Sequence, residues 1–350
     1  MTFILADSFE TVPIADPCND MALRGWGAIT HAEIQTSIFH DGTQAIKIDG
    51  SKNSFQETWG SVPATDAIHL GFWFYKDHEQ VDSFVRIETP GGDQLRIELL
   101  ADDNVRFNDT VLGVLGTSTN TPMSSDVWHY VEIKYRFNNS ISTDDCIIKI
   151  DGVEAVNLAA ATDTRQGQDT IDKVTLYGGG AVEENHYFDS FIMWDTQSGD
   201  DWNDFRGIIR CETKVPDANG QDNDFVGSDA NSVDNYLQVD ETKLHDGDST
   251  YNESPTVATN DSYNFPDIVA SDVQAIVGVQ VAMISKKTGA GAVDLTPFFV
   301  DGGSDHLGTE HVLTNGTYTF GSHMYDEDPQ ATAAWTAAKI SSGHFGLRVT

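Results

Sequence analysis

The chain has 350 residues, 39% of them hydrophobic and 10% aromatic, and its 55 Asp and Glu against 20 Lys and Arg give a formal net charge of -35. The length predicts two domains, because single cores stop growing well before this size, and the composition excludes a disordered or membrane-spanning chain. So negative a chain repels phosphate and has no basic stripe to neutralise it, which excludes nucleic acid and membranes as partners.

The first seven residues carry no basic region and only a short apolar run, which predicts that the chain has no signal peptide. We therefore expect synthesis in a cytoplasm, and arrival at the final place by assembly or lysis without a secretion step. The three cysteines, Cys18, Cys146 and Cys211, are far apart, odd in number and outside any zinc or CxxC spacing. This pattern predicts free, mostly buried thiols.

Residues 3–194 consist of short runs in which apolar and polar residues mostly alternate, separated by Gly, Asn, Asp and Pro. Such runs predict strands with one buried face, at the spacing of a two-sheet sandwich. Asp151-Gly152 predicts a tight hairpin, because Gly takes a positive φ without a steric penalty. The expected strands are 45–48, 68–75, 84–88, 95–100, 128–135, 146–150 and 187–194.

The large aromatic residues of these runs favour the core. Trp128 heads its strand, and we expect it to anchor the core because a Trp side chain buries a large apolar area. Trp73 lies in the run 71–75, where both strand phases are apolar, and this favours burial. The alternative is a platform that stacks sugar rings, with the candidate residues Trp26, Trp59, Trp73 and Tyr75.

Several of these segments, in this order, resemble the concanavalin A-like lectin and laminin-G superfamily, whose fold is a two-sheet jelly roll. The segments that carry the resemblance are 7–10, 41–48, 128–135, 146–153 and 187–194. The resemblance implies that the closing strand pairs beside the first strand. Neighbouring first and last strands bring the ends of a domain together, so a second domain can follow without strain.

The same resemblance implies a calcium ion, because in this superfamily the opening and closing strands often frame one with acidic side chains and carbonyl oxygens. The matching residues here are Asp7 and Asp189. Turn capping by these two carboxylates is the competing interpretation. The run 217–224 lacks the sixth-position Gly and the terminal Glu of an EF-hand loop, so we interpret it as a solvated loop.

A polar, Gly-containing stretch divides the chain into a jelly-roll domain at 1–196, a linker at 197–206 and a second, smaller β-rich domain at 207–350. In the second domain the Asp-, Asn- and Ser-rich stretch 216–267 is typical of loops. One short helix is expected at 332–339, which is rich in Ala and follows Asp328-Pro329. The expected strands are 207–213, 236–239, 273–283, 293–300, 317–320 and 345–349.

This second half resembles a domain of uncharacterised structural proteins of tailed bacteriophages. The resemblance rests on 216–236, on the Tyr-x-Phe-x-x-Ile pattern at 263–268, on the long run 273–283 and on 328–336. It implies a place on a virion, with other virion proteins as partners and assembly into a homo-oligomer.

Catalytic patterns are missing from the sequence. Glycosidases on a jelly roll carry a Glu-x-Asp-x-Glu strand, because two carboxylates must lie about 5 Å apart on one face. Here Glu88, Glu98 and Glu132 stand alone on their strands, which predicts a solvated outward face. The sequence also contains no HExxH, GxSxG or P-loop pattern. Single histidines remain, among them His129, His186, His306 and His311, and His129 is interpreted as structural because it lies in a strand pattern.

These observations predict an all-β, non-enzymatic virion structural protein exposed on the particle surface, as a tail or fibre component or a capsid decoration. A carbohydrate-binding adhesin is the alternative, and its partner would be a host-surface glycan. A polysaccharide-degrading enzyme that uses other acidic residues is a third hypothesis. Calcium is the one cofactor expected, at Asp7 and Asp189.

Overall fold

The computed structural model describes residues 3–10, 26, 32–49, 54–58, 67–78, 82–89, 92–119, 123–138, 140–142, 144–160, 162–164, 170–171, 173–178, 185–195, 204–241, 246–269, 271, 273–289, 291 and 293–350. The chain forms two compact units, Met1–Glu212 and Thr213–Thr350. Nearly all regular structure in both units is β, with one short α-helix among the described residues, which confirms the all-β prediction.

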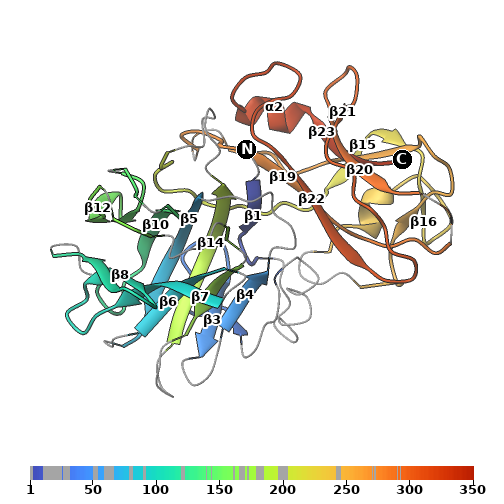
Figure 1. The fold of residues 1–350 in the computed structure, drawn as a ribbon. Coiled ribbons are helices and arrows are strands. Elements are labelled where there is room, and N and C mark those ends of the chain that lie inside the picture. The colour runs from blue at the N-terminus through green and yellow to red at the C-terminus, as the bar shows by residue number, and fades with distance from the viewer. Residues whose placement is uncertain are drawn as a thin grey trace. The chain divides into compact units, whose positions relative to one another are not determined.

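The first unit is an antiparallel sandwich of two sheets (Figure 1). The eight-stranded sheet contains β1 (Phe3–Asp7), β2 (Ala32–Gln35), β3 (Ala45–Asp49), β5 (Ala67–Lys76), β10 (His129–Arg136), β11 (Ile147–Ile150), β12 (Val153–Asn157) and β14 (Asn185–Asp195). The six-stranded sheet contains β4 (Ser54–Thr58), β6 (Asp82–Thr89), β7 (Gly92–Leu99), β8 (Val105–Asp109), β9 (Gly113–Thr117) and β13 (Lys173–Tyr177).

The order of the strands confirms two sequence-based expectations. The eight-stranded sheet runs β12-β11-β10-β5-β14-β3-β2, and β1 pairs with β14, so the first and last strands are neighbours. The other sheet runs β4-β13-β6-β7-β8-β9. Asp151 and Gly152 connect β11 to β12 with φ angles of 51° and 78°, the positive values that a two-residue hairpin turn requires.

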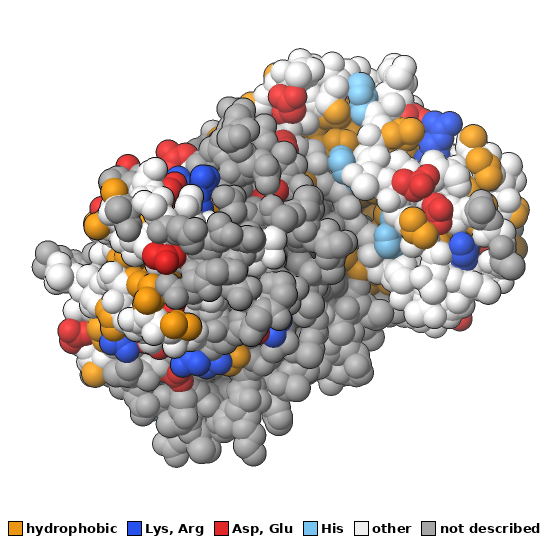
Figure 2. All heavy atoms as spheres, viewed as in Figure 1, with side chains coloured by type: hydrophobic (Ala, Val, Ile, Leu, Met, Phe, Trp, Pro, Cys, Tyr) orange, Lys and Arg blue, Asp and Glu red, His pale blue; other side chains and the backbone are white. Residues whose placement is uncertain are grey.

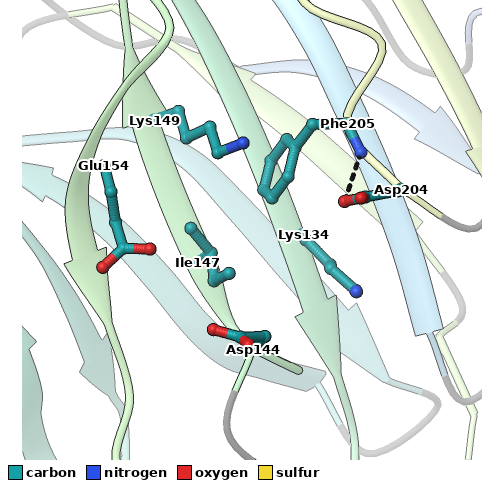
Figure 3. Close-up of a pocket in the computed structure, with 7 residues that line it drawn as sticks. All are labelled: Lys134, Asp144, Ile147, Lys149, Glu154, Asp204 and Phe205. Carbon is teal, nitrogen blue, oxygen red and sulfur yellow. Dashed lines mark hydrogen bonds between the residues drawn. The ribbon is translucent and has the colours of Figure 1, made fainter.

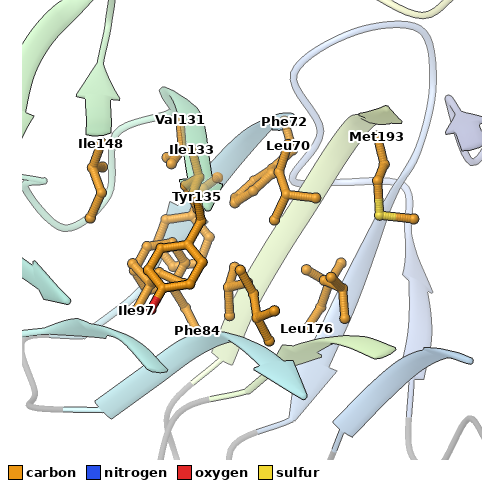
Figure 4. Packing of buried hydrophobic residues seen from close by; sticks show 14 of the residues in the cluster. Leu70, Phe72, Phe84, Ile97, Val131, Ile133, Tyr135, Ile148, Leu176 and Met193 are labelled. Carbon is orange, nitrogen blue, oxygen red and sulfur yellow. The ribbon is translucent and has the colours of Figure 1, made fainter. Parts of the chain in front are cut away.

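The core of the first unit lies between its two sheets (Figure 4). Leu70 and Phe72 of β5 point inward because residues two apart share a face of a strand. They meet Phe84, Ile97 and Leu176 of the opposite sheet, and all five side chains are fully buried. Ring contacts continue across the interface, with the Phe72 and Phe84 centroids 6.4 Å apart. The alternating pattern of the sequence therefore places the core as expected.

Residues 204–212, the covering segment, belong to the first unit and cross its eight-stranded sheet on the side away from the core. The Gly207 N–H donates to Glu132 Oε1 at 3.0 Å, and the Cys211 N–H donates to Ser190 Oγ at 3.3 Å. The expected strand at 207–213 is therefore wrong, since these backbone groups bond to side chains instead of a neighbouring strand. The linker boundary at 197–206 stays a prediction.

The second unit is built on a five-stranded antiparallel sheet of order β15-β18-β23-β20-β21, formed by β15 (Ala218–Asn223), β18 (Asn260–Asn264), β20 (Leu295–Val300), β21 (His306–Leu307) and β23 (His344–Val349). Two separate pairs are β16 (Val226–Gly227) with β17 (Asn252–Glu253), and β19 (Val279–Ser285) with β22 (Thr319–Tyr325). The helical elements are η1 (Asn235–Gln238) and α2 (Ala337–Ser342).

Several expectations for the second unit need correction. The stretch 216–267 contains strands, among them β15 where a solvated loop was expected, and 236–239 lies largely in the 3-10 helix η1. The α-helix begins at Ala337, later than expected, because Thr336 is its N-cap and accepts the Lys339 N–H through its side chain.

A buried polar network explains how so polar a stretch folds. Asp261 is fully buried and accepts hydrogen bonds from Asn235 Nδ2 (2.9 Å) and from the Tyr263 hydroxyl (2.5 Å). Asn252 Nδ2 donates to the Tyr263 hydroxyl oxygen at 2.9 Å. Burial raises the pKa of Asp261 to about 6. Hydrogen bonds between side chains thus allow polar groups to be buried here, although the polar composition of the stretch predicted exposure to solvent.

Acidic side chains are interspersed with basic and apolar ones over the described surface of both units in Figure 2, and histidines are visible on the second unit. Within the described residues, no helix is long and apolar enough to cross a membrane.

Candidate functional site

The outer face of the eight-stranded sheet carries the side chains that point away from the core. In β5 the outward side chains belong to the residues that alternate with the core residues. The strand register places Tyr130 of β10 opposite Trp73 of β5, and Tyr187 of β14 opposite Tyr75 of β5. A Cβ at Gly71 would lie 2.6 Å from the Tyr130 hydroxyl oxygen, so glycine leaves the space that the Tyr130 ring occupies. The outer face is therefore lined by aromatic side chains from three adjacent strands.

Five rings form an aromatic cluster at one end of this face, namely His40, Trp73, Tyr75, Trp128 and Tyr187. The His40 ring stacks on Trp73 with centroids 3.5 Å apart and an interplanar angle of 13°. Tyr75 lies between Trp128 at 5.5 Å and Tyr187 at 5.3 Å. Its hydroxyl donates to Asp126 Oδ1 at 3.0 Å. Burial raises the pKa of Tyr187 to about 12, so this phenol is neutral at physiological pH.

The aromatic cluster corrects two expectations. Trp128 is not a core anchor, because it precedes β10 and is half-buried against Tyr75 and His40 on the outer side. Trp73 is also half-buried on the outer face, and not in the core. Of the other platform candidates, Trp26 is buried beside Phe9, and Trp59 lies outside the described residues. In the run 71–75, apolar residues occupy both alternating faces of the strand, so the sequence could not show which of its rings face outward.

The covering segment buries the opposite end of the outer face. Phe205 stacks on His69 with centroids 5.4 Å apart, and Trp194 contacts the same imidazole at 5.1 Å. Neither ring nitrogen of His69 has a hydrogen-bond partner within the described part of the chain. Burial, reinforced by nearby Lys134 and Lys149, lowers the pKa of His69 to about 3. The imidazole is therefore neutral under the covering segment.

This lowered pKa predicts that His69 makes the first unit less stable in acid. Unfolded His69 binds a proton below about pH 6.5 but the folded imidazole does so only near pH 3, so stability falls by about 1.4 kcal/mol per pH unit between them. The variant H69Q should lose this part of the pH dependence in urea unfolding curves. The variant H78Q replaces a more exposed imidazole that pairs with Asp77 at 2.9 Å, and it should keep the part of the slope that comes from His69. Equal slopes for H69Q and the wild type would contradict the prediction.

A pocket of about 390 Å³ opens beside the covering segment on the outer face (Figure 3). Lys134 comes from β10 and Lys149 from β11, while the covering segment supplies Phe205. Its ring lies 3.8 Å from Lys149 Nζ in a cation–π contact. We call this the two-lysine pocket, and it is lined by Lys134, Asp144, Ile147, Lys149, Glu154, Asp204 and Phe205. The sequence analysis missed it, because its side chains converge from separate segments.

The three single glutamates face outward but are not solvated, which corrects that expectation. Glu132 is 1% exposed beneath Gly207, and burial raises its pKa. Glu98 accepts a hydrogen bond from Arg106 Nε at 2.7 Å, and Glu88 pairs with Lys173 at 2.6 Å. Glu132 lies on one sheet and the other two lie on the opposite sheet. Neither Glu88 nor Glu98 therefore forms a facing acid pair with Glu132.

The carboxylates of the two predicted calcium ligands, Asp7 and Asp189, accept hydrogen bonds from N–H groups of the protein. Asp7 Oδ1 accepts the Phe9 N–H (2.8 Å), and its Oδ2 accepts Trp26 Nε1 (3.0 Å). Asp189 is fully buried, and three backbone N–H groups donate to it. Desolvation raises the pKa of Asp189 to about 7 despite these donors, and nearby Asp41 adds to the rise.

These contacts fit hydrogen-bonded capping, the competing interpretation of the two carboxylates. Calcium takes six to eight oxygen ligands at roughly 2.3–2.6 Å, whereas both oxygens of each carboxylate are already bonded to N–H groups. The described residues contain no group of three or more His, Cys, Asp or Glu side chains arranged to hold a metal ion. Calcium at Asp7 and Asp189 stays a prediction.

The histidines and cysteines named from the sequence are spread over the molecule. His129 Nδ1 lies 2.8 Å from Asp151 Oδ2, and His186 Nδ1 lies 2.7 Å from the Tyr177 carbonyl oxygen. In the second unit, His311 Nε2 lies 3.0 Å from Thr319 Oγ1, and the carbonyl oxygen of His306 accepts the Tyr325 hydroxyl at 3.0 Å. Cys146 and Cys211 are free thiols, and Cys18 lies outside the described residues.

Comparisons with known proteins show similarity to solved structures alone. Neither a protein-family model nor a curated protein matches the chain. The cellulose-induced protein Cip1 is 15% identical with a TM-score of 0.41, and the match covers 56% of this chain and 99% of Cip1. Alginate lyase Aly36B is 14% identical with a TM-score of 0.37, covering 54% of this chain and 95% of the lyase. The Caenorhabditis elegans galectin LEC-6 is 12% identical with a TM-score of 0.30, covering 42% and 95%.

The identities and TM-scores of these matches are too low to assign a superfamily or to transfer an activity. The comparisons do not support the resemblance of residues 207–350 to phage structural proteins. The place on a virion and the homo-oligomer stay predictions.

Proposed function

We propose that the first unit is a non-enzymatic carbohydrate-binding domain that holds a glycan on the outer face of its eight-stranded sheet. The observation that carries this proposal is the aromatic cluster, whose rings from separate strands and loops meet at a surface. Aromatic rings offer an apolar face to the C–H side of a sugar, and polar groups beside them fix its orientation. Asp126, bonded to the Tyr75 hydroxyl, is such a polar group at the rim.

The environment of the aromatic cluster supports binding in preference to simple core packing. Tyr75 and Trp128 keep part of their surface exposed, whereas the inward-pointing Phe72 and Phe74 are fully buried. The hydrogen bond and the ring contacts hold Tyr75 in place before a ligand arrives, which reduces the entropy that binding must overcome.

A non-enzymatic role is proposed because the outward glutamates are occupied by other contacts. Glu132 accepts the Gly207 N–H under the covering segment, Glu98 holds Arg106, and Glu88 holds Lys173. Retaining glycosidases need two carboxyl groups about 5 Å apart, and inverting ones about 6.5–9.5 Å apart with room for water. These glutamates do not offer that arrangement.

Binding of the purified chain to an array of oligosaccharides, followed by calorimetry on the best ligand, tests the proposal. The variants Y75A and W128A should each weaken binding about tenfold, since an aromatic contact is worth roughly 1 kcal/mol beyond its buried area. The matched control is Y177A, which removes a tyrosine from the six-stranded sheet. Absence of any glycan binding, or equal affinities for Y75A and the wild type, would refute the proposal.

A further inference from the structure

Lys134 and Lys149 lack the carboxylate partner that several other lysines of this acidic chain have. Lys47 pairs with Glu33 at 3.3 Å and Lys173 with Glu88 at 2.6 Å, whereas Lys287 has no such ion pair among the described residues. Lys134 and Lys149 have no carboxylate oxygen within 4.0 Å among the described residues. Both come from adjacent strands, β10 and β11, and line the same pocket, where the Lys149 ammonium lies against the Phe205 ring and Lys134 extends in another direction (Figure 3).

The carboxylates of the two-lysine pocket are engaged by amide donors. Asp144 Oδ1 accepts Asn157 Nδ2 at 2.7 Å, and Glu154 Oε2 accepts the same nitrogen at 3.2 Å. Asp204 Oδ1 accepts the Phe205 N–H at 2.8 Å. A carboxylate has about four acceptor positions, so each of these groups can still accept a hydrogen bond from a ligand hydroxyl.

Phe205 holds the pocket in shape. Its ring is fixed by the stack on His69 at 5.4 Å and by the Lys149 ammonium at 3.8 Å, and Ile147 adds a second apolar side chain to the lining. Figure 3 shows Lys149 directed towards the Phe205 ring, and Asp144 and Glu154 away from that ring. The volume of about 390 Å³ falls within the range of small-ligand pockets.

We propose that the two-lysine pocket binds an acidic sugar residue, with its carboxylate or sulfate group between Lys134 and Lys149 and its hydroxyls donating to the pocket carboxylates. This inference rests on the proposed carbohydrate-binding function and names the ligand class of the same outer face. Anion–ammonium contacts are charge-assisted hydrogen bonds, roughly twice as strong as neutral ones. The net charge of -35 opposes anions at long range, but salt at about 0.15 M screens it beyond about 8 Å. Within the pocket the carboxylates of Asp144, Glu154 and Asp204 outnumber the two ammonium groups, so an anion must contact the lysines directly to bind.

Calorimetry with three ligand sets tests the inference on the full chain. The probes are a uronate oligosaccharide, the same oligosaccharide with its carboxyl groups reduced to alcohols, and a sulfated oligosaccharide. The wild type should bind at least one acidic probe about tenfold more tightly than the neutral one, and this advantage should shrink as salt rises from about 0.05 M to about 0.5 M. The two acidic probes distinguish a carboxylate site from a sulfate site.

The variant K134Q/K149Q should lose the preference for the acidic probe over the neutral one. The matched control K286Q/K287Q removes the same charge from the second unit and should retain the preference. Equal affinities for acidic and neutral probes in the wild type, or an unchanged preference in K134Q/K149Q, would overturn the inference while leaving glycan binding intact. Absence of binding to every probe and to every glycan of the array would overturn the proposed function itself.

Discussion

The variant F72A is expected to lower the free energy of unfolding of the first unit by about 3–5 kcal/mol, because removing a buried ring costs its transfer free energy and leaves a cavity. Phe72 is fully buried at the centre of the sandwich. Its ring packs against Phe84 of the opposite sheet, and against Phe188 at 5.6 Å and Phe191 at 5.9 Å on β14. Urea unfolding followed by near-ultraviolet circular dichroism measures the loss.

The control for this prediction is V114A on β9, where the side chain is 53% exposed and truncation should cost less than about 0.5 kcal/mol. The second unit should keep its own unfolding transition in F72A. A cost for F72A as small as that for V114A would contradict the placement of Phe72 between the two sheets.

The variant D189A is expected to destabilise the first unit by about 3 kcal/mol or more. It leaves the backbone N–H groups of His40, Asp41 and Ser190 without their acceptor, and each buried unsatisfied donor costs about 1–3 kcal/mol. The variant D189N retains one acceptor oxygen and should lose less stability. Chemical denaturation of both variants at pH 8, where the wild-type carboxylate is ionised, compares the two costs.

The same experiment with added calcium and with a chelator separates capping from metal binding. If Asp189 is a cap, the cost of D189A is the same under both conditions. A melting temperature of the wild type that rises with calcium, together with a cost of D189A that vanishes in chelator, would show a ligand role, because an ion bound to the folded state alone stabilises it. Asp7 serves as a second position, and D7A should follow D189A in its response to calcium.

The strands of the first unit could be predicted from the sequence because local alternation is enough to define them. The run 68–75 alternates between a core phase and an outer phase, and the structure has β5 at Ala67–Lys76. Asp151-Gly152 predicted its hairpin for a similar local reason, the need for positive φ. The second unit was harder, since the polar stretch 216–267 forms strands through side-chain networks such as the one at Asp261.

The candidate site was only partly visible in the sequence. Trp73 and Tyr75 were considered as a sugar platform, but core packing was favoured because both phases of their run are apolar. The two-lysine pocket was not foreseen. Lys134 and Lys149 look like ordinary polar positions of alternating strands, and Phe205 lies in a segment interpreted as the end of a linker. No local pattern indicates that these residues meet.

The sequence by itself determined the all-β class and most strands of the sandwich, because alternation of side chains and turn residues act over short distances. The pairing of the first and last strands was expected only from the family resemblance. Only the tertiary structure decided which face each aromatic ring occupies, that residues 204–212 cover His69 and Glu132, and that Lys134, Lys149 and Phe205 line one pocket. These features depend on contacts between segments far apart in the chain, and the pattern within one strand carries no information about what will lie across its outer face.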